Sequence, residues 1–232
     1  GGLHGFSLSE EGIRSPRDLQ ALWQADSSGG IRLNGAKGWV PMPEHCEAYF
    51  VVCRASGAEG ALSVVRMPAT AEGVSMNPRN PAAFMPELPA ARMQLQDVVL
   101  DASAMLPGDG WTDYARPFGA LEELYVSAAL MGYLVREGRA RDWPQALLRQ
   151  MLAAITLLER IAAEAGSNQS MVLLAGATEW VRTLLTRATA QWAEQPDDEA
   201  GQRWVRDQTV QRMWAASGAK RGDRAWQELT GE

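Results

Sequence analysis

Hydrophobic and polar positions follow two different periods along this chain, and the change between them falls near residue 115. Before that point, short apolar runs rich in valine, phenylalanine and tyrosine lie between glycine, serine and proline residues. In the segment 91–101, Met93 and Leu95 alternate with Gln94 and Gln96. Period-two alternation is typical of β-strands. We therefore expect residues 1–115 to form a small antiparallel β-barrel or sandwich.

A candidate hairpin lies in the first half of this region. It consists of the segments LQALWQAD, residues 19–26, and GIRLNGAKGWV, residues 30–40. The dipeptide Asn34-Gly35 provides the turn signal, because it readily adopts the positive φ angles of tight hairpin turns. The sequence therefore predicts strand, turn and strand within this stretch.

Two further strands are expected after the hairpin. Pro41 and Pro43 should end the preceding strand, because proline has no backbone N–H to donate. The runs EAYFVVCRA, residues 47–55, and GALSVVRM, residues 60–67, are apolar and bounded by glycine and serine. Such runs are typical of buried strands.

From residue 116 onward the apolar positions follow a helical period. The expected helices cover residues 117–138, 142–166, 167–195 and 197–229, and Gly218 or Gly222 is expected to break the last one. Short connections between successive helices favour antiparallel neighbours. The sequence therefore predicts an antiparallel four-helix bundle over residues 116–232, and an α+β fold class for the whole chain.

Composition narrows the functional classes. Hydrophobic residues make up 46% and charged residues 22%, which is ordinary for a soluble protein. A net charge of -6 opposes a nucleic-acid partner, and we find no apolar run long enough for a membrane span. Cys46 and Cys53 are expected to be reduced thiols, which favours a cytoplasmic protein. The two histidines, His4 and His45, are too few to predict a metal site.

Three segments occur in order along the chain: GFSLSEEGIRSP, IRLNGAKGWV and LQDVVLDASAMLPGDGW. Together they resemble the acyl-CoA dehydrogenase family of flavoproteins. GFSLSEEGIRSP, residues 5–16, is similar to the family's Leu-Thr-Glu-Pro and Gly-Ser-Asp segment. IRLNGAKGWV, residues 31–40, is similar to its Leu-Asn-Gly-x-Lys-x-Trp-Ile-Thr segment. LQDVVLDASAMLPGDGW, residues 95–111, resembles the strand and glycine-rich exit that lead into the C-terminal bundle. The resemblance implies the family's β domain followed by its helical bundle.

The resemblance also implies a cofactor, FAD, and positions that contact it. Leu8, Ser9 and Trp39 match flavin-contacting positions of the family, and Ser15 matches a position near the arm of the acyl thioester. An aromatic side chain beside a flavin shields the reduced ring from water and stacks on a conjugated system. The chain departs from the family at Pro41, which replaces a threonine whose hydroxyl and backbone N–H could bind the flavin.

The family reaction is α,β-dehydrogenation of an acyl thioester, in which a carboxylate removes the α-proton. Some members carry this base early in the first helix of the bundle, where this chain has Glu122 and Glu123. Alignment on Gly132 places Glu122 at the base, whereas alignment on Gly119 places Glu123 there. Acidic residues near a helix start are also favoured by the helix dipole alone, so a structural role is the alternative.

Three functional hypotheses follow from this resemblance. The first is an acyl-CoA dehydrogenase-like enzyme that binds FAD and an acyl-CoA, either as a homo-oligomer or with a partner chain that supplies the family's N-terminal helical domain. The second is a catalytically degenerate member that serves as a scaffold or partner-binding subunit. The third is a module that binds acyl-CoA without redox chemistry.

Overall fold

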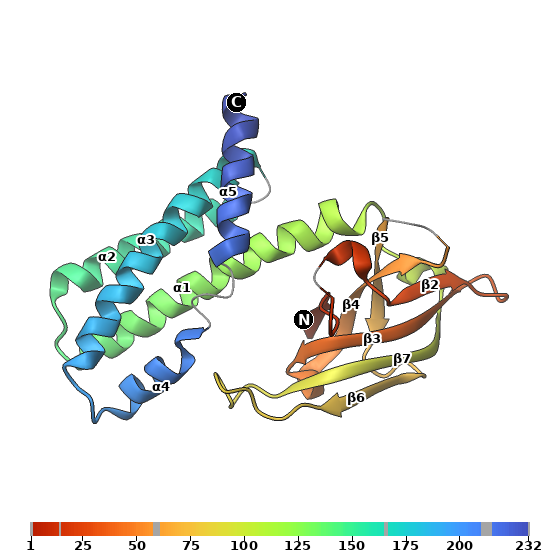
Figure 1. Cartoon of the computed structure of the whole chain (residues 1–232), viewed down its shortest axis with the longest axis horizontal. Helices are drawn as coiled ribbons and strands as arrows, with labels where there is room; N and C mark the ends of the chain where they lie inside the picture. Colours follow the sequence, from red (N-terminus) through yellow and green to blue (C-terminus); the bar gives the residue numbers. More distant parts are fainter. Residues whose placement is uncertain (1, 14, 58–60, 165–166, 210–214, 232) are drawn as a thin grey trace. The chain divides into compact units, whose positions relative to one another are not determined.

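The computed structural model describes residues 2–13, 15–57, 61–164, 167–209 and 215–231. The chain divides into two compact units, Gly1–Arg116 and Pro117–Glu232 (Figure 1). The first unit contains the β-strands and the second contains the long helices. The α+β fold class predicted from the change of period is confirmed.

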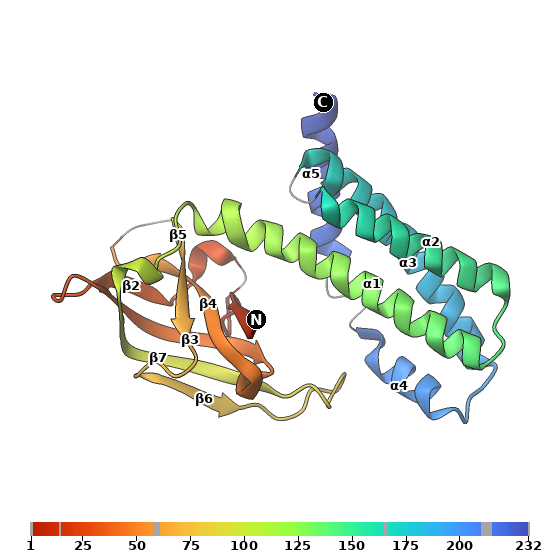
Figure 2. The same ribbon diagram turned by 180° about the vertical axis from the view of Figure 1, so that it is seen from behind.

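Seven strands of the described residues form one sheet. They are β1 (Leu3–Ser7), β2 (Leu22–Ala25), β3 (Ile31–Pro41), β4 (Cys46–Ala55), β5 (Leu62–Pro68), β6 (Val74–Pro78) and β7 (Ala90–Leu100). The strand order is β1-β4-β2-β3-β7-β6, and β5 pairs with β4. The long strands β3 and β7 run side by side in both views (Figures 1 and 2). Short 3-10 helices lie at Pro16–Asp18, Pro43–His45 and Ala102–Ala104.

The sheet is mixed rather than purely antiparallel. Strand β4 pairs in parallel with β1 and with β2, and antiparallel with β5. Parallel pairing is favoured where both faces of a strand are covered. This is the case for β4, because Val51 and Cys53 pack in one hydrophobic cluster and Val52 packs in another. The expectation of an all-antiparallel sheet is therefore wrong for the pairings of β4 with β1 and with β2, whereas β2 pairs antiparallel with β3.

The predicted turn at Asn34-Gly35 is also wrong, because β3 runs unbroken through it. The turn between β2 and β3 is instead formed around Asp26, whose N–H donates to Gly30 O over 2.9 Å. Gly35 has a φ of 139° in a register shift of the β3–β7 ladder. A Cβ atom there would lie 2.6 Å from the Cα atom of Ala21. The glycine therefore serves a bulge and a close backbone approach rather than a turn.

Five α-helices are described, and all of them lie in the second unit except for the first residue of α1. They are α1 (Arg116–Ala140), α2 (Gln145–Ala163), α3 (Asn168–Ala193), α4 (Glu199–Asp207) and α5 (Ala215–Thr230). A π-helical turn, Gly110–Ala115, precedes α1. Helices α2 and α3 lie side by side in both views, and α5 packs against α3 (Figures 1 and 2). The expected stop at Gly166 lies outside the described residues.

The last expected helix is divided, but not where the glycines predicted. Gly218 and Gly222 lie inside α5, and both are buried. With Ala225 they form a face of small residues that allows α5 to approach its neighbours closely. A Cβ atom at Gly222 would lie 2.5 Å from the Cβ atom of Ala175 in α3. The glycines therefore serve helix packing, although glycine disfavours a helix locally by about 1 kcal/mol.

Helix α1 supplies much of the bundle core. Its residues Leu124, Met131 and Leu134 are almost fully buried against α2 and α3 in one hydrophobic cluster. The helical run Gly110–Ala140 also has the length and composition of a membrane span, although no apolar run of that length was expected from the sequence. A core helix of a globular bundle meets the same criterion.

Candidate functional site

The two family-like segments of the β unit are held together by a buried ion pair. Lys37 Nζ on β3 lies 2.6 Å from Glu10 Oε1, and their side chains are 0% and 6% exposed. The Glu10 carboxylate also accepts the backbone N–H groups of Gln20 and Ala21, at 2.6 and 3.1 Å. Burial lowers the pKa of Lys37, and the negative charge of Glu10 opposes that shift. The pair fixes the segment around residue 10 against β3.

Ser9 and Trp39 are brought together next to this ion pair. Gly38 N–H donates to Ser9 O over 2.8 Å, and Lys37 Nζ lies 3.4 Å from Leu8 O. The β3–β7 register shifts between Lys37 and Val40, so Trp39 lies in a β-bulge. Bulges re-aim side chains and are common beside functional sites. The three residues that the resemblance assigned to flavin contact therefore lie in one region of the β unit.

The exposure of these residues differs. Ser9 is exposed, whereas Leu8 and Trp39 are half-buried. Leu8 packs partly against a small apolar cluster that contains Leu19 and Val52. Trp39 is therefore not a full member of the core, and part of its indole is available to a ligand.

A cation lies over the Trp39 ring. The guanidinium carbon of Arg79 is 5.4 Å from the centroid of the indole, within the range of a cation–π contact. Arg79 Nη1 donates to Gly38 O over 2.8 Å and forms an ion pair with Glu11. The hydrogen bond from Arg79 holds the pKa of Glu11 below its usual value, and the Arg92 charge adds to this effect. Arg79 could not be identified from the sequence, because it follows β6 and lies 40 positions from Trp39.

A polar cavity of about 260 Å³ borders the same region. The residues that line it are Glu10, Glu11, Gln20, Gly35, Ala36, Gly38, Arg92 and Gln94. Small residues of β3 form part of its wall, so backbone atoms are accessible there. A Cβ atom at Gly38 would lie 3.0 Å from the Cγ atom of Glu11, so a side chain at this position would crowd that wall. The cavity can accept a ligand with hydrogen-bonding groups.

Ser15 is half-buried at the start of the 3-10 helix Pro16–Asp18. Its carbonyl oxygen accepts the N–H of Asp18 over 2.9 Å. The assignment of Ser15 to the acyl thioester remains a prediction.

Glu123 lies inside the helical unit, where it pairs with Arg221 of α5. Its side chain is 6% exposed and that of Arg221 is 18% exposed. Burial raises the pKa of Glu123, whereas the Arg221 charge and hydrogen bond and the Arg182 charge lower it. Gly218 provides the space for this carboxylate, because a Cβ atom there would lie 2.6 Å from Glu123 Oε1. The geometry assigns Glu123 to the attachment of α5 to α1.

Glu122 has the opposite environment. It is exposed, whereas its neighbour Glu123 is buried, because consecutive residues of a helix point in directions about 100° apart. Of the two carboxylates that the sequence left as alternatives, Glu122 is the one at the surface of the bundle. The structure therefore separates two adjacent glutamates that the sequence could not distinguish. Within the described part of the chain, no group of three or more histidine, cysteine, aspartate or glutamate residues could hold a metal ion.

The β unit and the helical bundle define the class of fold found in acyl-CoA dehydrogenases. A probable acyl-CoA dehydrogenase from Mycobacterium abscessus matches with a TM-score of 0.74 and 13% identity, over 96% of this chain and 68% of that one. Butyryl-CoA dehydrogenase from Megasphaera elsdenii matches with a TM-score of 0.71 and 17% identity, over 97% and 68%. FMN-bound TdsC from Paenibacillus sp. A11-2 matches with a TM-score of 0.78 and 14% identity, over 100% and 71%.

These similarities establish the fold. The chain spans about two thirds of the length of these three structures, since it covers 68%, 68% and 71% of them. No protein-family model matches the sequence, and no curated protein matches it. The resemblance to acyl-CoA dehydrogenases read from three short segments is therefore confirmed at the level of the fold.

The residues around Trp39 fit the edge of a flavin. An exposed serine hydroxyl at Ser9, a half-buried indole and an adjacent polar cavity together offer hydrogen-bond donors and an aromatic surface. The Arg79 guanidinium adds a positive charge near the indole, where a reduced flavin would carry negative charge. Pro41 has neither the hydroxyl nor the backbone N–H that the family's threonine would provide as hydrogen-bond donors. The Ser9 hydroxyl, the Trp39 indole and the Arg79 guanidinium are groups of the kind that would hold a flavin ring, with one hydrogen bond fewer than the family's threonine would allow.

Proposed function

We propose that this chain is an acyl-CoA dehydrogenase-like flavoprotein that binds FAD against Ser9, Leu8 and Trp39. The observation that best supports this proposal is the contact between the two family-like segments. The Glu10–Lys37 ion pair and the Gly38–Ser9 hydrogen bond join the segment that carries the exposed Ser9 to the strand that carries the half-buried Trp39. The Arg79 guanidinium adds a positive charge beside the indole, which complements an electron-rich ring.

The proposed reaction is the α,β-dehydrogenation of an acyl thioester. A flavin, when bound, supplies the acceptor for the hydride that leaves the β-carbon. The chain itself must remove the α-proton and hold the thioester. We assign the proton transfer to the carboxylate of Glu122, because Glu123 is enclosed in the bundle and paired with Arg221. Ser15 is the proposed contact for the thioester arm.

The experiment has two stages. In the first, purified protein is titrated with FAD and with FMN, and the visible absorbance of the flavin and the tryptophan fluorescence are followed. Saturable binding is expected for the wild type, and Trp39→Ala should weaken it about tenfold, the loss expected when one good ring contact worth about 1.4 kcal/mol is removed. Trp111→Phe is the matched control, because Trp111 is exposed and lies far along the chain from this region.

In the second stage, short- and medium-chain acyl-CoA substrates are added to the flavin-loaded protein without oxygen. Loss of the visible flavin absorbance reports reduction. Glu122→Gln should abolish reduction while flavin binding persists, whereas Glu123→Gln should retain reduction if the fold is intact. The reverse result would identify Glu123, rather than Glu122, as the base.

A second candidate function is a flavin-free member of the same fold, acting as a scaffold or partner-binding subunit. The observation that favours it is the combination of Pro41 and an Arg79 side chain that already occupies one face of Trp39. It predicts no flavin binding in the first stage. Calorimetric titration with acyl-CoA then distinguishes a scaffold, which gives no heat, from a module that binds acyl-CoA without redox chemistry. Self-association or capture of a partner chain in solution is expected for the scaffold.

A further inference from the structure

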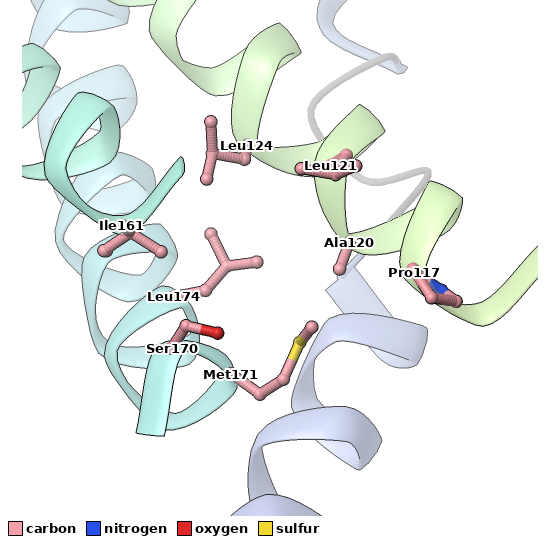
Figure 3. Close-up of a pocket in the computed structure, with 8 residues that line it drawn as sticks. All are labelled: Pro117, Ala120, Leu121, Leu124, Ile161, Ser170, Met171 and Leu174. Atoms are coloured by element: carbon pink, nitrogen blue, oxygen red, sulfur yellow. The ribbon is translucent and has the colours of Figure 1, made fainter. Parts of the chain in front are cut away.

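A small apolar pit lies within the helical unit, between the start of α1, the end of α2 and the start of α3 (Figure 3). It is lined by Pro117, Ala120, Leu121, Leu124, Ile161, Ser170, Met171 and Leu174. Its cavity volume is about 70 Å³. All of these residues belong to the unit Pro117–Glu232, so the pit is complete within one compact body.

The base of the pit is buried and its rim is open. Ala120, Leu124, Ile161 and Leu174 are 2%, 2%, 3% and 4% exposed. Figure 3 shows the side chains of Leu124 and Leu174 pointing into the space between the helices. The rim residues Pro117, Leu121 and Met171 are only half-buried, so a small molecule can enter from solvent.

The lining is chemically apolar. Among the eight described residues that line the pit, Ser170 alone has a polar side chain, and its hydroxyl donates to Ser167 O over 2.7 Å. A water molecule needs two to four polar partners, and genuinely apolar cavities stay dry. The wall therefore offers no favourable site for water and gains free energy when hydrocarbon covers it.

We infer that this pit is a binding site for the end of a short unbranched hydrocarbon chain, with any polar head group left in solvent at the rim. An apolar cavity of about 150 Å³ accepts benzene, so a pit of about half that volume accepts roughly three or four carbon atoms in line. Met171 supports this assignment, because an unbranched thioether adapts its shape to different apolar neighbours. The inference uses only residues of the unit Pro117–Glu232 and does not rest on the proposed function.

The probes are the neutral n-alkanols from ethanol to hexanol, with xenon as a probe that has no head group. Binding to the full chain is followed by the methyl resonances of Met171, Leu174 and Ile161. Affinity is expected to rise about fourfold for each added methylene, the ratio that corresponds to ~0.8 kcal/mol. The rise should stop at three or four carbons, where the pit is full. Binding that shows no saturation, or no dependence on chain length, would overturn the assignment.

Ala120→Leu fills the pit and should weaken alkanol binding at least tenfold. Ala129→Leu makes the same change at an exposed position of α1 and should leave binding unchanged. If Ala120→Leu does not fold, Met171→Ala provides an independent test, because a wider pit should move the plateau to chains longer by about two carbons. Equal binding by all four proteins would refute the site. So would a wild type that self-associates in light scattering and becomes monomeric as Ala120→Leu, because a side chain of a second copy would then fill the pit.

Discussion

Lys37 Nζ lies 2.6 Å from Glu10 Oε1, and this ion pair is almost completely shielded from solvent. It joins the two segments through which the chain resembles the acyl-CoA dehydrogenases. Burying two charges costs more than an exposed pair returns, so the pair is maintained by its hydrogen bonds as well as by charge. The backbone N–H groups of Gln20 and Ala21 donate hydrogen bonds to Glu10, and these bonds link the ion pair to the segment that enters β2. The pair therefore positions Ser9 and Trp39 as well as the strands.

Removing one partner of this pair should destabilise the β unit strongly. Lys37→Met leaves the Glu10 carboxylate buried without its cation, and we expect a loss of about 3–5 kcal/mol in the free energy of unfolding. Urea titration followed by circular dichroism measures it. The double variant Glu10→Gln, Lys37→Met should recover much of the loss, because no unpaired charge remains.

The control for Lys37→Met is an exposed ion pair. Arg160 and Glu164 lie 3.0 Å apart with side chains 78% and 51% exposed. Arg160→Met should change the free energy of unfolding by less than about 1 kcal/mol. A loss of equal size in Lys37→Met and Arg160→Met would contradict the buried role of Lys37.

Two helical glycines should respond in opposite directions to alanine. At Gly132 in α1 an added Cβ atom meets nothing within 4 Å, so Gly132→Ala should stabilise the protein by up to about 1 kcal/mol, the difference in helix propensity. At Gly218 in α5 the Cβ atom would meet the Glu123 carboxylate at 2.6 Å. Gly218→Ala should therefore lose that gain and destabilise the contact with α1. Thermal unfolding of both variants measures the contrast, and stabilisation by Gly218→Ala would show that the carboxylate moves aside freely.

The Glu123–Arg221 pair should make stability depend on pH. Burial raises the pKa of Glu123 above its ordinary value of 4.5. A folded state that binds a proton more tightly than the unfolded chain gains stability at low pH. This contribution is fully present below 4.5 and is lost as the pH rises through the folded pKa. The excess stability of the wild type over Glu123→Gln should thus fall in urea titrations as the pH rises above 4.5. A constant difference as the pH rises would show that Arg221 offsets the effect of burial.

Cys53 should be unreactive in the folded protein. Its thiol is fully buried, and burial raises its pKa from 9.0 to about 12. Only the thiolate reacts with alkylating reagents, and a rise of three pKa units reduces its population about a thousandfold. Iodoacetamide at mildly alkaline pH should therefore label Cys53 only after urea is added, as read by peptide mass spectrometry. Rapid labelling of Cys53 in the native protein would indicate that the core of the β unit opens readily.

Much of the fold follows from local patterns. The change from a period of two to a helical period predicts a β region followed by a bundle, because each period buries one face of its own element. The helix expected from residue 167 begins there in the structure, where the Ser167 side chain caps α3. The family-like segments that contain Ser9 and Trp39 also predict that these residues share one region. The structure brings the two segments together through the hydrogen bond from Gly38 N–H to Ser9 O.

The remainder depends on contacts between residues distant in sequence. Asn34-Gly35 has the local chemistry of a hairpin turn, but the backbone of Ala21 passes so close that only a glycine bulge fits there. Arg79 reaches Trp39 only because β6 and β3 both pair with β7. No local pattern contains such information.

The sequence by itself determined the two kinds of secondary structure, their order and the residues of the two family-like segments, because periodicity and short motifs are properties of neighbouring residues. Only the tertiary structure decided which of the adjacent carboxylates is enclosed. Glu122 and Glu123 are chemically identical and differ by a single position, and the distinction arises because Arg221 and Gly218, far along the chain, pack on one side of α1 and not on the other.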